Sequence, residues 1–239
     1  MVLQRAPQRA IVWGYADTFD APITLTISNK TYHTKTSSSS ANAKGEAMWT
    51  IQLDAQTEEG PFDIHVNIHL SNGTIVTITL HDVLVGDVWI CSGQSNMSFS
   101  VSNMYNATYE INNAYKYPKI RLFTASRQQS DVALEELLAI WLNWSIANAS
   151  SVGSPYASAV CWLYGRMIHS ALGGRPIGLV HSSWGGTPIE LWSPPEVLAD
   201  CGIKERDVGV SFNNSDLYNA MMHPFTRMVI YGAIWYQGF

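Results

Sequence analysis

The pattern of apolar residues changes near residue 84, and this change constrains the fold more than any other feature of the sequence. Before it, apolar and polar residues alternate, strictly in Ile23–Ile27 and over nine residues in Phe62–Leu70. After it, Val83–Cys91 is an almost continuous apolar run. Alternation predicts strands with one face in water, whereas a continuous run predicts a parallel strand covered on both faces. We therefore expect two domains, residues 1–84 and 85–239.

Residues 1–84 predict an all-β domain. Phe62–Leu70 runs into the turn sequence Ser71–Gly73, and alternation resumes over residues 76–80, which predicts a β-hairpin. Met48–Leu53 is a further strand candidate. Short strands with one polar face favour a β-sandwich.

Residues 85–239 predict an open α/β sheet, because apolar strands alternate with helical stretches. After Val83–Cys91, the expected strands are Ile120–Phe123, Ile177–Val180 and Val229–Trp235. Ser154-Pro155 is a typical helix start, apolar residues then recur at helical spacing as far as Ala171, and Gly173-Gly174 is a typical stop.

Composition excludes several classes of protein. Hydrophobic residues make up 46% of the 239 residues, enough for a sizeable core, and charged residues only 14%. The net charge is -5 without a basic run, which disfavours a nucleic-acid partner. No apolar run approaches the roughly 18 residues of a membrane span. Without an H-E-x-x-H or C-x-x-C pattern we expect no metal and no cofactor, and the oligomeric state stays open.

Two features bear on the cellular compartment. Seven N-x-[ST] glycosylation acceptors favour a secretory-pathway protein, although Met1–Pro7 has no apolar segment typical of a signal peptide. The acceptors are Asn29, Asn72, Asn96, Asn106, Asn143, Asn148 and Asn213. Of the three cysteines, Cys91 and Cys161 lie in apolar stretches and are expected to be buried thiols.

Polar loops follow three of the predicted strands. Cys91–Met97 continues a buried strand through a glycine turn to Ser95, whose hydroxyl is then exposed beside a helix N-terminus, unless Ser95 only caps that helix. His181–Thr187 carries two glycines after a strand, and Gln237 follows the last strand. Because parallel strands end at one edge of a sheet, these loops form one candidate site, although the second is also compatible with an ordinary turn.

These residues resemble the sialate O-acetylesterases of the SGNH esterase superfamily. Gly86-Asp87-Val88-Trp89 with Gly93-Gln94-Ser95-Asn96-Met97 is similar to the family's nucleophile block, and Ser182–Glu190 is similar to the next. Leu217–Pro224 and Trp235–Gly238 are similar to the third. The resemblance extends over almost the whole chain.

The resemblance implies an SGNH-like three-layer α/β/α domain and a carbohydrate esterase of the lysosome or the secretory pathway. Ser95 is then the nucleophile that attacks the acetyl group of an O-acetylated sialic acid or sialoglycan. Gly186 and Gln237 join the Ser95 N–H in the oxyanion hole. Gln94, Asn96 and Trp184 are the expected substrate contacts.

The chain departs from the family at Phe239, where the family has a glutamate, and the family's later Asp/His block is absent. The resemblance therefore implies a chain that is truncated and inactive as given, unless His181 or His223 serves as the base. Two alternatives remain open, a non-catalytic glycan-binding or regulatory relative, and an acetylesterase for another acetylated sugar.

Overall fold

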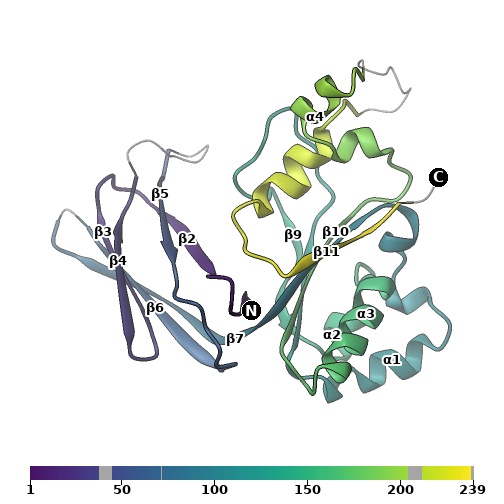
Figure 1. Ribbon diagram of the computed structural model, residues 1–239, viewed down its shortest axis with the longest axis horizontal. Coiled ribbons are helices and arrows are strands. Elements are labelled where there is room, and N and C mark those ends of the chain that lie inside the picture. Colours follow the sequence, from purple (N-terminus) through teal and green to yellow (C-terminus); the bar gives the residue numbers. More distant parts are fainter. Residues whose placement is uncertain (38–44, 71, 204–211, 238–239) are drawn as a thin grey trace. The chain divides into compact units, whose positions relative to one another are not determined.

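The structure is a computed structural model that describes residues 1–37, 45–70, 72–203 and 212–237 (Figure 1). The chain divides into two compact units, Met1–Gly86 and Asp87–Phe239, called here the first and second unit. Strand β7 (Ile75–Gly93) contributes residues to both. Among the helices of the described ranges, none combines the length and apolar character needed to cross a bilayer.

The first unit consists of strands. They are β1 (Val2–Gln4), β2 (Ile11–Ala16), β3 (Pro22–Ile27), β4 (Lys30–Lys35), β5 (Ala47–Gln52), β6 (Phe62–His69) and the first part of β7. One sheet has the antiparallel order β4-β3-β6-β7, with β1 parallel to β7, and β2 pairs with β5 in a second sheet. The predicted strands and the β6–β7 hairpin are confirmed, although Ser71 of the turn lies outside the described residues.

Alternation along these strands creates the core of the first unit. In β6, the side chains of Ile64, Val66 and Ile68 are buried, while Asp63 and His65 between them are exposed. The buried residues of β3 and β6 belong to one hydrophobic cluster with those of β2 and β5. The two sheets of this unit therefore share a core.

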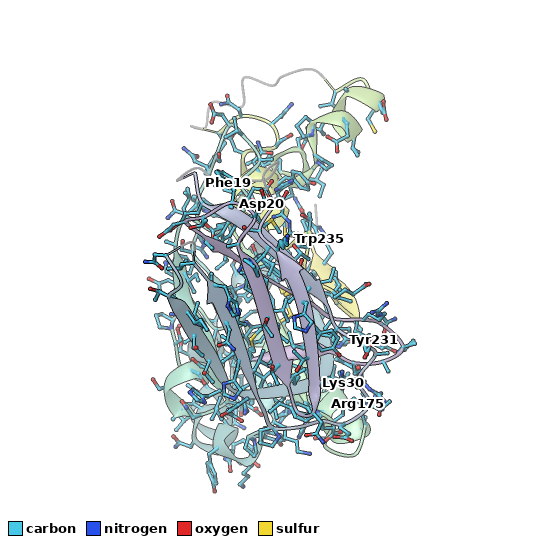
Figure 2. All side chains as sticks on the ribbon, turned by 90° about the vertical axis from the view of Figure 1, so that its left-hand side faces the viewer. Phe19, Asp20, Lys30, Arg175, Tyr231 and Trp235 are labelled. Atoms are coloured by element: carbon cyan, nitrogen blue, oxygen red, sulfur yellow. A yellow bond between two sulfur atoms is a disulfide. The ribbon has the colours of Figure 1, made fainter. Side chains whose placement is uncertain are left out.

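The second unit is a mixed sheet with helices. Its strands beside the end of β7 are β8 (Ile120–Ala125), β9 (Ile140–Ile146), β10 (Ile177–Ser183) and β11 (Gly232–Tyr236). Pairing gives the order β11-β7-β10-β8-β9, all parallel except β9. Figure 2 labels Tyr231 and Trp235, which lie near the two ends of β11 and are both exposed. β9 was not predicted, although an apolar run, 137–142, leads into it; within the strand Asn143 and Ser145 interrupt the apolar residues, and the strand is partly exposed.

Several short helices connect these strands. The α-helices are α1 (Ala107–Asn113), α2 (Ala149–Val152), α3 (Ala159–Ala171) and α4 (Pro195–Asp200). The 3-10 helices are η1 (Ser95–Ser98), η2 (Val101–Asn103), η3 (Ala114–Lys116), η4 (Ile189–Trp192) and η6 (His223–Phe225), and η5 (Tyr218–Met222) is a π-helix.

Several boundaries differ from the sequence prediction, among them the start of β11, which is Gly232 rather than Val229. Strand β7 runs unbroken from Ile75 to Gly93, whereas we expect two strands there, because the polar residues His81 and Asp82 interrupt the apolar pattern without ending the pairing. Helix α3 begins at Ala159 rather than at Pro155, because the Ser158 side chain accepts a hydrogen bond from the Cys161 N–H and caps the helix.

Helices lie on both faces of the sheet in the second unit. Leu179 of β10 contacts α3 so closely that a Cβ on Gly165 would lie 2.6 Å from it. Successive strand residues face opposite sides, and Ser182 Oγ of the same strand donates to Met221 O of η5 at 2.8 Å. Figure 1 shows α1, α2 and α3 together on one side of these strands and the yellow-green η5–η6 segment on the other.

Candidate active site

The carboxyl ends of three parallel strands meet where the sequence predicts a site. Ser183, the last residue of β10, is in register with Gly93, the last residue of β7, and Tyr236 of β11 pairs with Gly93 from the other side. The Gln94 N–H donates to Tyr236 O at 3.0 Å, and the Trp184 N–H donates to Gly93 O at 3.1 Å. The three predicted loops are therefore neighbours.

The turn after β7 requires an unusual backbone. Gly93 has a φ of 128°, and a Cβ there would lie 2.2 Å from Tyr236 O, so only glycine fits. Ser95 has a φ of 44°, a left-handed conformation that is rare for residues other than glycine and clusters at functional sites. The N-cap position of η1 is held by Gln94, and Ser95 is the first residue inside the helix, with its side chain bonded to Gln94 rather than to a backbone N–H of the helix.

The hydroxyl of Ser95 and the N–H of Gly186 both point at one oxygen atom. Ser95 Oγ donates a hydrogen bond to Gln94 Oε1, and the Gly186 N–H donates to the same oxygen at 3.2 Å. The bond from the Gly186 N–H also fixes which end of the Gln94 amide is the oxygen, since an NH2 group there would meet a donor. Ser95 is exposed, whereas Gln94 is only 2% exposed.

The other predicted contacts surround this point. A Cβ on Gly185 would lie 3.6 Å from the Ser95 N, so the second loop passes directly beside Ser95. Gln237 Nε2 donates to Thr187 O at 3.0 Å in the same loop, and Gly238 and Phe239 lie outside the described residues. Exposed Asn96 donates to the Tyr236 hydroxyl at 3.2 Å. Trp184 is half-buried and packs edge-on against Phe212.

His181 is buried below this edge of the sheet and makes no bond to Ser95. Its Nδ1 donates to Tyr156 O at 2.9 Å, so its Nε2 accepts a hydrogen bond from Ser183 Oγ at 2.6 Å. Ser183 Oγ in turn lies 2.8 Å from Ser98 Oγ of η1. Burial lowers the pKa of His181 to about 4, so the imidazole is neutral at pH 7.

The lowered pKa of His181 predicts a pH-dependent stability. An unfolded histidine titrates near 6.5, so as pH falls the unfolded state takes up the proton first, and the stability present at neutral pH is lost between about 6.5 and 4. We expect a loss of about 3 kcal/mol from this residue. Denaturant unfolding at pH 7 and pH 4 measures it, and His181→Gln should show a smaller loss. The control is His65→Gln, which replaces an exposed histidine. If His181→Gln and His65→Gln lost the same unfolding free energy between pH 7 and pH 4, the low pKa of His181 would not be the cause of the loss.

His223 is also held by a backbone carbonyl. Its Nδ1 donates to Leu134 O at 2.8 Å, and its ring packs near Tyr218 with centroids 6.0 Å apart. Among the hydrogen bonds of the described residues, none joins His223 or His181 to Ser95. The structure therefore brings Ser95, Gln94, Gly186 and Gln237 together and leaves both histidines engaged elsewhere.

The structure corrects the prediction for two of the cysteines. Cys91 of β7 and Cys161 of α3 form a disulfide with their Cα atoms 5.8 Å apart, and are not free thiols, whereas Cys201 is free and exposed. Seventy residues separate the two, and pairing across that distance cannot be deduced from spacing. The bond ties α3 to the strand that leads to Ser95. Among the described residues no group of three or more His, Cys, Asp or Glu side chains is arranged to hold a metal.

Sequence reasoning missed one charged residue at this edge, Arg127. It follows the end of β8, which lies beside β10 in parallel, and its Nε donates to Ser183 O at 3.3 Å. The reasoning that identified the other loops, polar residues after the end of a parallel strand, also applies to β8.

The fold and this site place the chain among the carbohydrate esterases. The family of carbohydrate esterases described as sialic acid-specific acetylesterases matches residues 85–239. The chain belongs to this family.

Similar proteins agree with this membership. Sialate O-acetylesterases of Homo sapiens and Pongo abelii are both 40% identical over the whole chain, and the Mus musculus protein is 37% identical. The chain spans about half the length of these relatives, 46% of the first two and 50% of the third. The crystal structure of a carbohydrate acetylesterase from Xanthomonas citri superposes with a TM-score of 0.80 at 30% identity, covering 99% of this chain and 48% of that one.

Proposed function

We propose that the protein to which this chain belongs removes O-acetyl groups from sialic acids or sialoglycans, with Ser95 as the nucleophile. Ser95 Oγ attacks the acetyl carbonyl and its proton passes to a base. The bond between the acyl carbon and the sugar oxygen then breaks, the base returns the proton to that oxygen, and the sugar leaves with a free hydroxyl while the acetyl group stays on Ser95. Water then attacks the acyl carbonyl, which releases acetate and restores the Ser95 hydroxyl. No cofactor takes part in this scheme.

The observation that carries the proposal is the convergence on Gln94 Oε1. The Ser95 hydroxyl and the Gly186 N–H both hydrogen-bond this one oxygen. An acyl oxygen that displaced Gln94 Oε1 would meet the same Gly186 donor beside the attacking oxygen, which is what an oxyanion hole requires. In the proposed reactive state, Gln237 Nε2 donates its hydrogen bond to the oxyanion instead of to Thr187 O. Asn96 and Trp184 then lie on either side of the sugar.

Two architectural statements belong to the same proposal. The second unit corresponds to the SGNH-like three-layer domain expected for residues 85–239, and helices on both faces of its sheet support this. The first unit corresponds to the β-sandwich expected for residues 1–84, and the core shared by its two sheets supports this.

We further propose that the 239-residue polypeptide by itself turns over slowly. The two histidines considered as bases are held by carbonyls, His181 by Tyr156 O and His223 by Leu134 O. Moreover, the low pKa of His181 makes it a weak base. The family resemblance implies that an Asp/His block supplies the base, rather than either of these two histidines.

The test compares two polypeptides on O-acetylated sialic acid. One is the 239-residue chain, and the other, called here the extended protein, continues the chain to the length of its curated relatives. We expect acetate release from the extended protein and at least tenfold slower release from the short chain. Turnover by the short chain within about tenfold would assign the base to an internal histidine, and His181→Gln would be the first variant to assay. Binding of sialoglycan without any acetate release from the extended protein would favour a glycan-binding relative.

The disulfide supports a secretory or lysosomal location, because such bonds persist in oxidising compartments. The seven acceptor sequences are consistent with a glycoprotein in that pathway. If protein isolated from cells had three reactive thiols, the disulfide would be absent there and would no longer support this location.

A further inference from the structure

Among the described residues, Arg127 has no carboxylate partner, in contrast to three other arginines of the second unit. Arg166 pairs with Glu110 at 2.9 Å, Arg175 pairs with Asp87 at 3.0 Å, and Arg227 pairs with Glu135. Within the described part of the chain, Arg127 forms no ion pair with an acidic side chain. A guanidinium that is partly removed from water without a counter-ion is costly for a fold to keep.

The guanidinium of Arg127 is nevertheless held in position. Its Nε donates to Ser183 O at 3.3 Å, and it lies over the ring of Trp141, 5.3 Å from the centroid. Trp141 is itself stacked on Tyr156 with centroids 3.7 Å apart. Burial lowers the pKa of Arg127, but an arginine side chain stays protonated in proteins. The two terminal nitrogens therefore form a fixed and charged fork with no partner among the described residues.

This fork belongs to the same edge of the sheet as Ser95. The Ser183 carbonyl oxygen accepts the hydrogen bond from Arg127. The Ser183 hydroxyl lies 2.8 Å from Ser98 Oγ, which belongs to η1, the short helix that begins at Ser95. Two residues after Ser183, Gly185 passes directly beside Ser95. Arg127 and Ser95 thus flank one short segment, residues 183–185.

We propose that Arg127 binds the carboxylate of an acidic sugar whose acetyl ester lies at Ser95. The planar fork of an arginine matches a carboxylate with two parallel hydrogen bonds. The inference rests on the proposed function, which it deepens, because it selects acidic sugars such as sialic acids over neutral acetylated sugars. Arg127 is thereby a specificity-determining residue that takes no part in bond breaking.

Binding to the 239-residue chain tests this without requiring turnover. The probes are the α-methyl glycoside of N-acetylneuraminic acid and the methyl ester of that glycoside, in which the carboxylate charge is removed. NMR titration should show the acid binding at least roughly tenfold more tightly than the ester, as a charge-assisted hydrogen bond provides. Arg127→Gln should bind the acid as weakly as the wild type binds the ester and should not distinguish the two probes. Arg127→Lys should restore part of the preference, because it keeps the charge and loses the fork.

Arg227→Gln is the matched control, since Arg227 already pairs with Glu135, and it should leave the preference for the acid unchanged. Thermal melts of each variant exclude unfolding as the cause of weak binding. Equal binding of acid and ester by the wild type, no binding of either, or an unchanged preference in Arg127→Gln would overturn the proposal. Failure of the extended protein to release acetate, with this binding pattern intact, would count against the esterase function alone.

Discussion

Replacing Ser95 with alanine in the extended protein should lower kcat for acetyl-ester hydrolysis by about 10⁴–10⁶. The loss of a nucleophile typically has this size, because only substrate binding and oxyanion contacts remain. Release of 4-nitrophenol from its acetate and of acetate from O-acetylated sialic acid both measure the effect. Since Ser95 has a left-handed backbone that alanine also disfavours, a thermal melt must show that the variant is folded.

Ser102→Ala is the control for this experiment. Ser102 is an exposed serine of the neighbouring helix η2 whose hydroxyl bonds to Ser100, and we expect its variant to keep activity close to that of the wild type. A folded Ser95→Ala variant that keeps more than about a tenth of wild-type kcat would move the nucleophile to another residue.

Removing the disulfide should cost the second unit about 4 kcal/mol of stability, the value expected when a bond that closes a loop of 70 residues is lost. Cys91→Ala combined with Cys161→Ala should lower the melting temperature by on the order of 10 °C. Both cysteines are buried in the cluster between α3 and the sheet, so lost packing adds to the effect.

Cys201→Ala separates the disulfide from cysteine loss in general, because Cys201 is free and exposed. This variant should melt within about 2 °C of the wild type. Thiol titration of the denatured wild type should find one reactive thiol. The pairing would be contradicted if the double variant had the same melting temperature as Cys201→Ala, or if three thiols reacted in the denatured wild type.

The sheet was predictable because its parallel strands are continuous apolar runs. Strands β7, β8 and β10 are apolar in sequence because both of their faces are buried. The end of α3 was predictable from the two glycines that closely follow it in the sequence. Strand β9 was missed although an apolar run leads into it, because the rest of this partly exposed edge strand alternates with the polar residues Asn143 and Ser145. The start of α3 was placed too early because Pro155 suits a first turn, while the bond that caps the helix comes from Ser158.

The site was predictable only in outline. Strand ends place Ser95, Gly186 and Gln237 together, but sequence does not reveal that Gln94 turns inward and accepts bonds from two of the loops. The burial of His181 and its bond to Ser183 depend on Tyr156, which is 25 residues away in the chain. Arg127 follows the end of β8 and was open to the same strand-end argument, but nothing in its immediate sequence shows that no acidic side chain of the described residues pairs with it.

The most direct test of the account is to locate the acyl group on the enzyme. The extended protein is mixed with 4-nitrophenyl acetate, quenched in acid during the first turnover, digested and analysed by mass spectrometry. The account predicts an acetyl group on Ser95, and none on that peptide in Ser95→Ala. An acetyl group on a different residue, or steady turnover with no acetyl on Ser95 in the early quench, would contradict it.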